Sequence, residues 1–303
     1  MDYDIRKNTF KIGIIALLIS AIITALSQVY YANKVQGIHP FLFTGISFFV
    51  TAIYFQTFAM KQRVKVQWQE ARRPLVLLNM ASIITFMGFY FALKYIEPAI
   101  VSSLEMGIGP LFILLLAVFQ KTAVRQKQWY IAIGTFIACT VLILAVLLGE
   151  SGVKMQLSIE VILGIVASLL CGVGAVFCSI HSKQLNDLGW TSSMILAKRY
   201  IGIIIISFIF TYDLVIPYFK ANITWILLIT VVGVMLPMYL LQKGIQYTNT
   251  FIVMMSLCFI PVFTFAFQLL DARIQFSGLT FIGVSLLFLF GVLSILGENK
   301  EMG

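Results

Sequence analysis

Residues 92–112 read ALKYIEPAIVSSLEMGIGPLF, and residues 244–263 read GIQYTNTFIVMMSLCFIPVF. In each stretch an apolar run ends at a tyrosine, a short connection follows, and a second apolar run contains a proline. Tyr95 precedes Pro110 by 15 residues, and Tyr247 precedes Pro261 by 14. Arg125 before Gly134 and Arg273 before Gly283 extend the match. The shared order of these features indicates an internal repeat.

Apolar runs of membrane-spanning length occupy most of the chain, because a helix crosses the hydrocarbon with about 20 residues. The ten predicted runs are 12–32, 40–60, 74–94, 98–119, 128–149, 159–181, 191–212, 222–243, 247–270 and 276–297. The chain is 60% hydrophobic and 11% charged, too few charges to coat a soluble domain of 303 residues. The runs are continuously apolar, which favours helices over barrel strands. Pro40, Pro74 and Pro98 are predicted at first helical positions, where a missing N–H costs little.

Five spans in each half make the second half cross the membrane in the opposite direction to the first. The sequence therefore predicts an all-α membrane protein with ten transmembrane helices, arranged as two inverted five-helix repeats around a central cavity. The predicted repeats are residues 1–150 and 151–303. Inverted repeats of this kind place a solute site near the bilayer midplane, between the halves.

The net charge of +9 does not indicate a nucleic-acid partner, because the basic residues sort by side of the membrane. With the N-terminus inside, fourteen are cytoplasmic: Arg6, Lys7, Lys11, Lys61, Arg63, Lys65, Arg72, Arg73, Lys121, Arg125, Lys127, Lys183, Lys243 and Lys300. Five lie on the other side: Lys34, Lys94, Lys154, Lys220 and Arg273. We expect a multi-pass protein of the inner cell membrane with both termini in the cytoplasm. Almost all of the bias comes from the first half.

At Ala92-Leu93-Lys94-Tyr95 and the proline-containing fourth span, the chain resembles the drug/metabolite transporter superfamily, in particular its ten-span branch with paired EamA domains. It departs from the common pattern at Ser27-Gln28, where a Trp-Gly pair is usual. It also lacks an arginine near Phe48 and Phe49, whereas Arg199 occupies the corresponding seventh span. The resemblance implies a solute carrier with a central cavity, most often an exporter of amino acids or metabolites.

Glu105 is the sharpest candidate site residue, since a charge inside a membrane span is costly and usually faces the protein interior or water. We expect it to bind a cationic group or a proton, with a hydrogen-bonded packing role or contact with headgroups as the alternative. Gly109 and Pro110 follow about one turn later. They are predicted to weaken the helix as a hinge and to free carbonyls for the cavity.

Polar and aromatic stripes on two other spans predict a pocket around this acid. Ser20, Thr24, Ser27, Gln28 and Tyr31 share one face of the first span. On the third span Asn79, Ile83, Phe86 and Tyr90 do the same, and we predict that Asn79, Phe86, Tyr90, Gln28 and Tyr31 bind substrate. Rings beside an acid suit an amine, because cation–π attraction grows when water is excluded. The alternative is that these stripes only join helices by hydrogen bonds.

The second half adds a basic residue and two further hinge candidates. Arg199 is predicted either to pair with a substrate carboxylate or to extend toward headgroups, as we expect for Lys198. Pro237 and Pro261 are predicted to bend their helices. The stripe of Gly164, Ser168 and Gly172 permits close helix approach, within the chain or in a homodimer.

Chemistry other than transport has little support in the sequence. Cys139, Cys171, Cys178 and Cys258 all fall inside predicted spans and have no C-x-x-C spacing, so we interpret them as packing residues rather than metal ligands. No H-E-x-x-H, G-x-S-x-G or P-loop pattern occurs, so we expect no enzyme activity and no cofactor.

The sequence therefore predicts a secondary transporter that moves a small polar metabolite, an amino acid or a related compound, by alternating access, with export as the expected direction. Lipid surrounds it, and Glu105 is the candidate for coupling to protons. An uptake carrier for an organic cation such as a choline-like amine is the alternative. A non-transporting assembly or sensor subunit also stays open.

Overall fold

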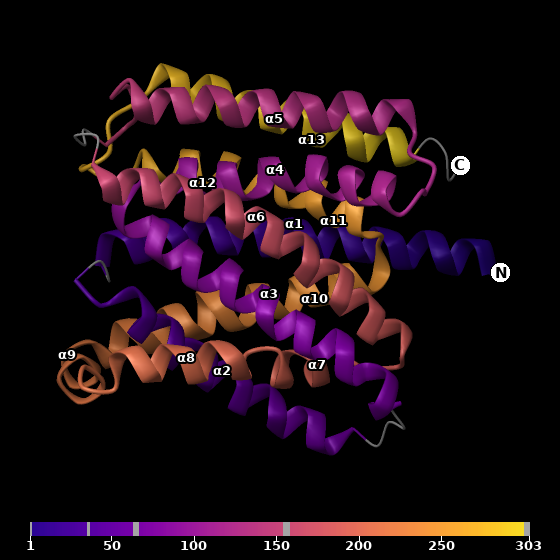
Figure 1. The fold of residues 1–303 in the computed structure, drawn as a ribbon, viewed down its shortest axis with the longest axis horizontal. Helices are drawn as coiled ribbons and strands as arrows, with labels where there is room; N and C mark the ends of the chain where they lie inside the picture. The colour runs from indigo at the N-terminus through magenta and orange to yellow at the C-terminus, as the bar shows by residue number, and fades with distance from the viewer. Residues whose placement is uncertain (1, 35–36, 63–66, 154–157, 300–303) are drawn as a thin grey trace.

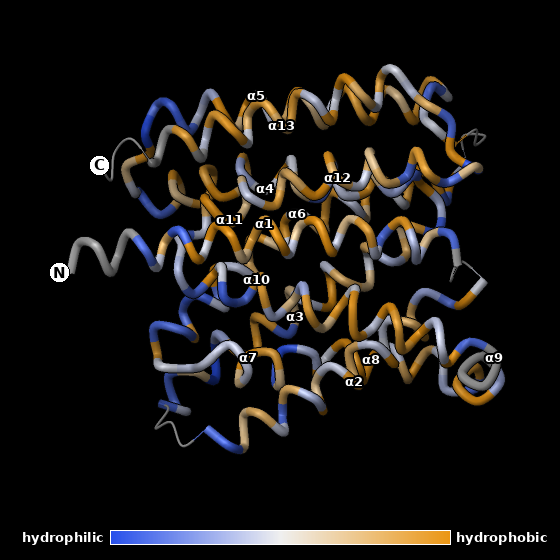
Figure 2. Tube along the Cα trace, turned by 180° about the vertical axis from the view of Figure 1, so that it is seen from behind, coloured by the Kyte–Doolittle hydropathy of each residue, from blue (hydrophilic) through white to orange (hydrophobic). Residues whose placement is uncertain are grey.

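The computed structural model describes residues 2–34, 37–62, 67–153 and 158–299. Among the charges used for orientation, Arg63, Lys65, Lys154 and Lys300 lie outside the described residues, as do the side chains of Arg6, Lys7, Lys34 and Lys220. The described chain is helical, with short connections. Its long helices run side by side, with hydrophobic residues along their lengths and hydrophilic residues toward the two ends (Figures 1 and 2).

The first half contains five unbroken spans. They are α1 (Asp2–Lys34), α2 (Pro40–Lys61), α3 (Trp68–Tyr95), α4 (Pro98–Phe119) and α5 (Gln126–Leu147). Pro40 and Pro98 stand at the start of their helices, as predicted. The prediction for Pro74 was wrong, because α3 begins six residues earlier, at Trp68. The polar first turns extend the helix beyond the apolar run, which hydropathy alone does not reveal.

Three spans of the second half are interrupted, unlike those of the first. Its helices are α6 (Ile159–Asp187), α7 (Ser192–Lys198), α8 (Ile201–Thr211), α9 (Val215–Leu228), the π-helix η1 (Ile229–Met235), α10 (Leu236–Tyr247), α11 (Thr250–Leu257), α12 (Phe259–Gln268) and α13 (Gly278–Asn299). The seventh span therefore breaks at Arg199 and Tyr200, the eighth contains a π-helix, and the ninth breaks at Cys258. In Figure 1 part of α9 is seen along its axis, so it lies across the direction of the spans, whereas the second half of α9, from Asn222, begins the eighth span, Asn222–Tyr247.

Nine helical stretches of the described chain are long and apolar enough to cross a membrane, and α13, with 22 residues, is a further apolar helix. The helix α1 begins and α13 ends at the same end of the bundle, which we call the terminal end (Figure 1). The other end, where α1 ends and α13 begins, is the opposite end. The ten predicted runs thus correspond to helical segments, and their all-helical membrane fold is confirmed.

The helices pack in corresponding pairs from the two halves. α1 packs on α10 as α6 packs on α3, and α1 packs on α12 as α6 packs on α4. Three further pairs join a helix to its own counterpart: α2 with α7 and α8, α4 with α12, and α5 with α13. In Figure 1 α5 and α13 form one edge of the bundle, and α2, α7 and α8 form the other. The core lies between these edges.

The backbone has a similar geometry at residues 92–112 and 244–263, the two stretches that indicated the repeat. Ile96 and Thr248 both end their helices in extended conformation, with φ of −132° and −127°. Their N–H groups donate to Ala92 and Gly244 at 2.9 and 3.0 Å. Two residues then separate α3 from α4 and α10 from α11. The sequence similarity that predicted the repeat therefore corresponds to a similar turn at opposite ends of the bundle.

Candidate functional site

A cavity of about 90 Å³ lies in the middle of the bundle. One water needs roughly 10–15 Å³ by the same kind of measure, so the cavity has room for several waters or a small polar group of that size. Both halves of the chain line it. Its polar and aromatic lining consists of Ser20, Thr24, Ser27, Gln28, Tyr31, Phe48, Thr85, Phe86, Phe89, Tyr90, Glu105, Cys178, Ser179 and Arg199.

Glu105 lines this cavity from α4 and is only 5% exposed. Its backbone is held close to α6, because a Cβ atom at Gly172 would lie 2.3 Å from the Glu105 carbonyl oxygen. Within the described chain, no hydrogen bond or ion pair involves the Glu105 carboxylate. A buried carboxylate without a partner is costly unless it takes up a proton or meets a donor or cation. Glu105 is thus available to a ligand or a proton.

Arg199 lines the same cavity from the interruption between α7 and α8, and is 2% exposed. Its Nε donates to Ser82 Oγ at 3.3 Å. Its guanidinium carbon lies 5.7 Å from the centroid of the Phe86 ring and 5.3 Å from that of Tyr200. The rings and the hydroxyl hold the guanidinium without neutralising it, since no described carboxylate lies within ion-pair distance. Its position favours the predicted interior role over extension toward headgroups.

Aromatic rings form two groups around the cavity. Tyr31, Phe43 and Tyr90 surround one another, with centroid separations of 4.7 to 5.0 Å. Phe48 lies 4.6 Å from Phe86 and 4.4 Å from Tyr200, which continues the cluster to Arg199. Tyr90 lies near Glu105 in the cavity lining. The cavity therefore places rings beside both charged residues.

The polar stripe of α1 both lines the cavity and joins helices. Ser20 Oγ donates to the carbonyl of Pro237 at 2.8 Å, and Gln28 accepts from Thr264 at 3.2 Å. Ser27 lies against Gly233 of the π-helix. The stripe can therefore line the pocket and join helices by hydrogen bonds at the same time.

Asn79 does not line the cavity. Its amide nitrogen donates to the carbonyls of Leu75 and Lys198, both at 3.0 Å. Its amide oxygen accepts from the N–H of Gly202 at 3.0 Å. These two contacts with the seventh span bracket the interruption at Arg199 and Tyr200. The geometry gives Asn79 a supporting position behind Arg199 rather than a place at the predicted substrate surface.

The predicted hinge residues have different surroundings in the two halves. α4 stays a continuous α-helix through Gly109 and Pro110, so the expected weakening is not seen there. Proline removes the hydrogen bond to the carbonyl four residues earlier, and that carbonyl, of Met106, accepts from Cys258 Sγ at 3.5 Å. Pro237 is the second residue of α10, just after η1, and Pro261 is the third residue of α12, just after the break at Cys258. Motion at any of the four positions stays a prediction.

The small-residue stripe of α6 is used inside the chain. Gly164 packs against Ile96, and Gly172 packs against Ile108 and the backbone of Glu105. Ser168 Oγ donates to the carbonyl of Gly164 at 2.8 Å. The stripe therefore allows α6 to reach the start and middle of α4.

Several site residues escaped the sequence prediction. Ser82, which holds Arg199, and Thr85, which lines the cavity, share a face of α3 with Phe86 and Phe89 at helical spacing. That spacing was a usable signal. No sequence signal set Phe48 and Tyr200 apart, because aromatic residues are common throughout this apolar chain.

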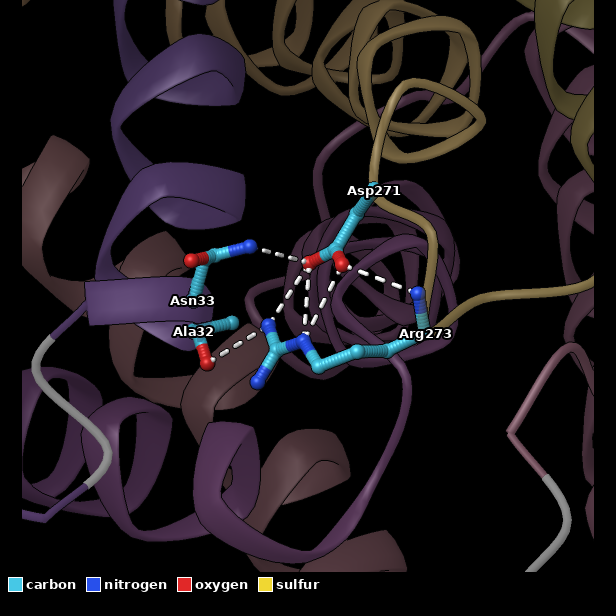
Figure 3. A network of polar contacts seen from close by, with 4 residues as sticks. All are labelled: Ala32, Asn33, Asp271 and Arg273. Atoms are coloured by element: carbon cyan, nitrogen blue, oxygen red, sulfur yellow. Dashed lines mark hydrogen bonds and ion pairs between the residues drawn. The ribbon is translucent and has the colours of Figure 1, made fainter.

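Polar contacts join the helices at the opposite end. The Asp271 carboxylate accepts from Arg273 Nη2 at 2.6 Å and from Asn33 Nδ2 at 3.0 Å, and Arg273 Nη2 also donates to the carbonyl of Ala32 at 3.0 Å (Figure 3). Hydrogen bonds from Arg273 hold the pKa of Asp271 well below its ordinary value. The end of α1 is thereby fixed to the connection between α12 and α13.

Glu97, at the start of α4, makes a second connection at this end. It is 1% exposed and accepts from the N–H of Gly152 at 2.6 Å and from the amide of Gln268. Burial raises the pKa of Glu97 above its ordinary value, although these two hydrogen bonds oppose the rise. One side chain therefore links α4, α12 and the segment between α5 and α6.

At the terminal end the contacts among the described residues involve fewer charged groups than at the opposite end. Some buried polar side chains there have no hydrogen-bond partner within the described chain. Lys183 Nζ donates to the carbonyl of Gln246 at 2.9 Å, and Thr191 Oγ1 donates to Gln62 at 2.5 Å. The buried side chains of Ser182 and Gln242, in the terminal halves of α6 and α10, make no hydrogen bond within the described chain. Each such group costs about 1–3 kcal/mol while unsatisfied. Water or a polar solute that reached them would lower that cost.

Residues 11–145 match the EamA-like transporter family. The predicted resemblance is confirmed over these residues, which hold nearly all of the first five spans. The match supports a membrane transporter of small solutes.

A solved structure entitled "Crystal structure of protein" resembles the whole chain. It covers 98% of this chain and 99% of its own, with a TM-score of 0.67 and 16% sequence identity. At that identity the likeness concerns the fold alone. No curated protein matches the chain significantly.

Proposed function

We propose that this chain is a secondary transporter of a small zwitterionic metabolite, such as an amino acid, that works by alternating access in the inner cell membrane. The observation that carries the proposal is that Glu105 and Arg199 line one cavity, both nearly fully buried, without pairing with each other. A solute with an ammonium and a carboxylate group gives each of them a partner. Charge-assisted hydrogen bonds to such groups are stronger than neutral ones.

The positions of the two charges along the bundle support this substrate class. Glu105 lies seven residues from the start of α4 at the opposite end, and Arg199 lies seven residues from the start of α7 at the terminal end. At about 1.5 Å per residue, each charge is roughly 10 Å from its own end of a core about 30 Å thick. The charges therefore flank the midplane from opposite sides, where inverted repeats hold their substrates.

Alternating access is supported by the corresponding helix pairs of the two halves and by the interrupted spans of the second half. We propose residues 1–150 and 151–303 as the two inverted repeats, supported by the corresponding contacts of α1 with α10 and α6 with α3. We propose that Pro237 and Pro261, beside the π-helix and the break at Cys258, are the places where the second repeat bends. Gly109 and Pro110 would act in the first repeat through their contact with the ninth span.

The proposal also includes a membrane orientation and a direction of transport. The excess of basic residues at the terminal end favours that end as cytoplasmic, with both termini inside. Export is taken from the family resemblance. Protons are the proposed coupling ion, because Glu105 has no other described partner for its charge.

An uptake carrier for an organic cation is the second candidate, favoured by the rings of Tyr31 and Tyr90 near Glu105. Cation–π attraction would hold a quaternary ammonium there. The positive charge of Arg199 in the same cavity opposes a substrate that carries only positive charge. For this reason we place the zwitterion first.

Counterflow in proteoliposomes tests the proposal, with labelled amino acids, amines and carboxylic acids as separate substrates. We expect accumulation of zwitterions, and a loss of at least tenfold for Glu105→Gln and for Arg199→Gln. Glu70→Gln and Lys198→Gln are matched controls, because they change an acid and a base that do not line the cavity. Amine transport that survives Arg199→Gln but fails in Glu105→Gln would instead favour the organic-cation carrier. Transport of zwitterions that is unchanged in both variants would refute the assignment of the site.

Proton coupling has its own readout. Wild-type transport should depend on an imposed pH gradient, and any residual transport by Glu105→Gln should not. A variant that still responds to the gradient as wild type does would exclude Glu105 as the coupling residue.

A further inference from the structure

A second, larger pocket opens on the side of the bundle between α2 and the eighth span. Its volume is about 420 Å³. We call it the lateral groove, and its lining residues are Tyr54, Phe55, Phe58, Ser193, Val231, Val232, Met235, Leu236 and Tyr239. Tyr54, Phe58, Val231, Val232 and Leu236 are each more than 40% exposed. In a membrane these side chains face lipid, so the groove is open to an acyl chain.

Aromatic rings connect the two walls of the groove. The rings of Phe55 and Tyr239 stack, with centroids 5.8 Å apart and planes at 13°. Tyr54 lies 5.2 Å from Phe55 and 5.0 Å from Phe58. This continuous row gives the groove a firm apolar wall rather than a set of loose aliphatic side chains.

A lysine stands at each end of this row. Lys61 Nζ lies 5.9 Å from the centroid of the Phe58 ring, and Lys243 Nζ lies 5.8 Å from that of Tyr239. Both residues lie near the terminal end, at the last residue of α2 and four residues before the end of α10. Two ammonium groups beside an apolar groove at the membrane surface match a negatively charged headgroup. Basic pockets between transmembrane helices bind anionic lipids in this way.

The length of the groove fits a single leaflet. Lys243 and Val231 are twelve residues apart on one helical stretch, or somewhat less than about 18 Å, because the π-helix rises less per residue than the 1.5 Å of an α-helix. Half of a hydrocarbon core of about 30 Å is of similar depth. A lipid whose headgroup lies at the lysines would thus reach the inner end of the groove with its acyl chain.

We propose that the lateral groove binds one anionic phospholipid, with an acyl chain along Tyr54, Phe58 and Val232 and the phosphate at Lys61 and Lys243. The π-helix η1 separates this lipid from the central cavity. Gly233 and Val234 of η1 line the cavity, whereas Val231, Val232 and Met235 line the groove. The lipid would therefore contact the outer face of an interrupted span whose inner face lines the candidate solute site.

Native mass spectrometry of the purified full-length protein tests the proposal, with phosphatidylglycerol and phosphatidylcholine of identical acyl chains as probes. Wild type should bind phosphatidylglycerol more tightly. The double variant Lys61→Gln with Lys243→Gln should lose about 25-fold in affinity for it, or about fivefold for each lysine near an anionic lipid surface. Its affinity for phosphatidylcholine should stay within about twofold. High salt should weaken binding in wild type more than in the double variant.

Lys94→Gln is the matched control. Lys94 Nζ also lies over a ring, 5.7 Å from the centroid of Tyr95, but at the opposite end and away from the groove. It should leave affinity unchanged. Val232→Trp changes an exposed groove residue and should weaken binding of both lipids by filling the space for the acyl chain. Equal binding of the two lipids by wild type, an equal loss in Lys94→Gln, or unchanged binding in the double variant or in Val232→Trp would each overturn the proposal.

Discussion

The backbones of α6 and α4 touch where Gly172 meets Glu105, since a Cβ atom on Gly172 would lie 2.3 Å from the Glu105 carbonyl oxygen. This contact fixes the depth of the candidate charge in the cavity. A side chain at residue 172 would push the two helices apart and move the carboxylate with them.

Gly172→Ala is therefore expected to destabilise the protein by about 1–3 kcal/mol, the usual cost of overpacking. It should also reduce transport per folded molecule, and thermal unfolding in detergent with proteoliposome flux measures both effects. Gly278→Ala is the control, because no heavy atom lies within 4 Å of its added Cβ. Equal behaviour of the two variants would contradict the close contact.

Asn79→Ala should lower stability and leave substrate affinity unchanged. The change removes hydrogen bonds to Lys198 and Gly202 on either side of the interruption in the seventh span. At about 1 kcal/mol for each net hydrogen bond, we expect a loss of about 2 kcal/mol. The measurements are thermal unfolding and the KM for counterflow. A raised KM without loss of stability would restore the substrate-binding role that the sequence predicted.

Ser82→Ala should act through Arg199. The hydroxyl of Ser82 accepts from Arg199 Nε at 3.3 Å, so its removal lets the guanidinium move while the charge remains. We expect the KM for a zwitterion to rise several-fold and maximal flux to change little. Ser168→Ala is a matched control, since among the described residues Ser168 bonds within its own helix, and it does not line the cavity. If both variants had the same KM as wild type, Ser82 would have no positioning role.

Asp271→Asn should lower stability in a pH-dependent manner. The folded-state pKa of Asp271 is depressed by Arg273, so its contribution is complete above the unfolded pKa of about 3.9 and is lost as pH falls below it. We expect a difference of about 1 kcal/mol from wild type, because Arg273 is half-exposed and solvent screens the pair. The difference in thermal stability should be constant from pH 5 to 8 and shrink below about pH 4. A difference that instead grew on acidification would contradict this assignment.

Hydropathy was sufficient to predict the spans and the membrane fold, because twenty apolar residues have few other stable arrangements. The helix starts at Pro40 and Pro98 were predictable too, because a proline at the first helical position is a signal carried by the local sequence. The break at Arg199 and Tyr200 was not predictable, since its contacts come from Asn79, more than a hundred residues earlier in the chain. The hydrogen bonds of Asn79 to the seventh span were not predictable for the same reason. A polar residue on an inward face meets either a cavity or another backbone, and only the packing decides which.

The connections at the opposite end have a kinetic consequence. Arg273 holds the carbonyl of Ala32 and the carboxylate of Asp271 at the same time, and Glu97 joins three further segments. Separation of the helices there must break several charge-assisted bonds together. A solute leaving through that face would meet a larger activation enthalpy than one leaving beside Lys183 and Thr191. Its release should therefore slow more steeply on cooling.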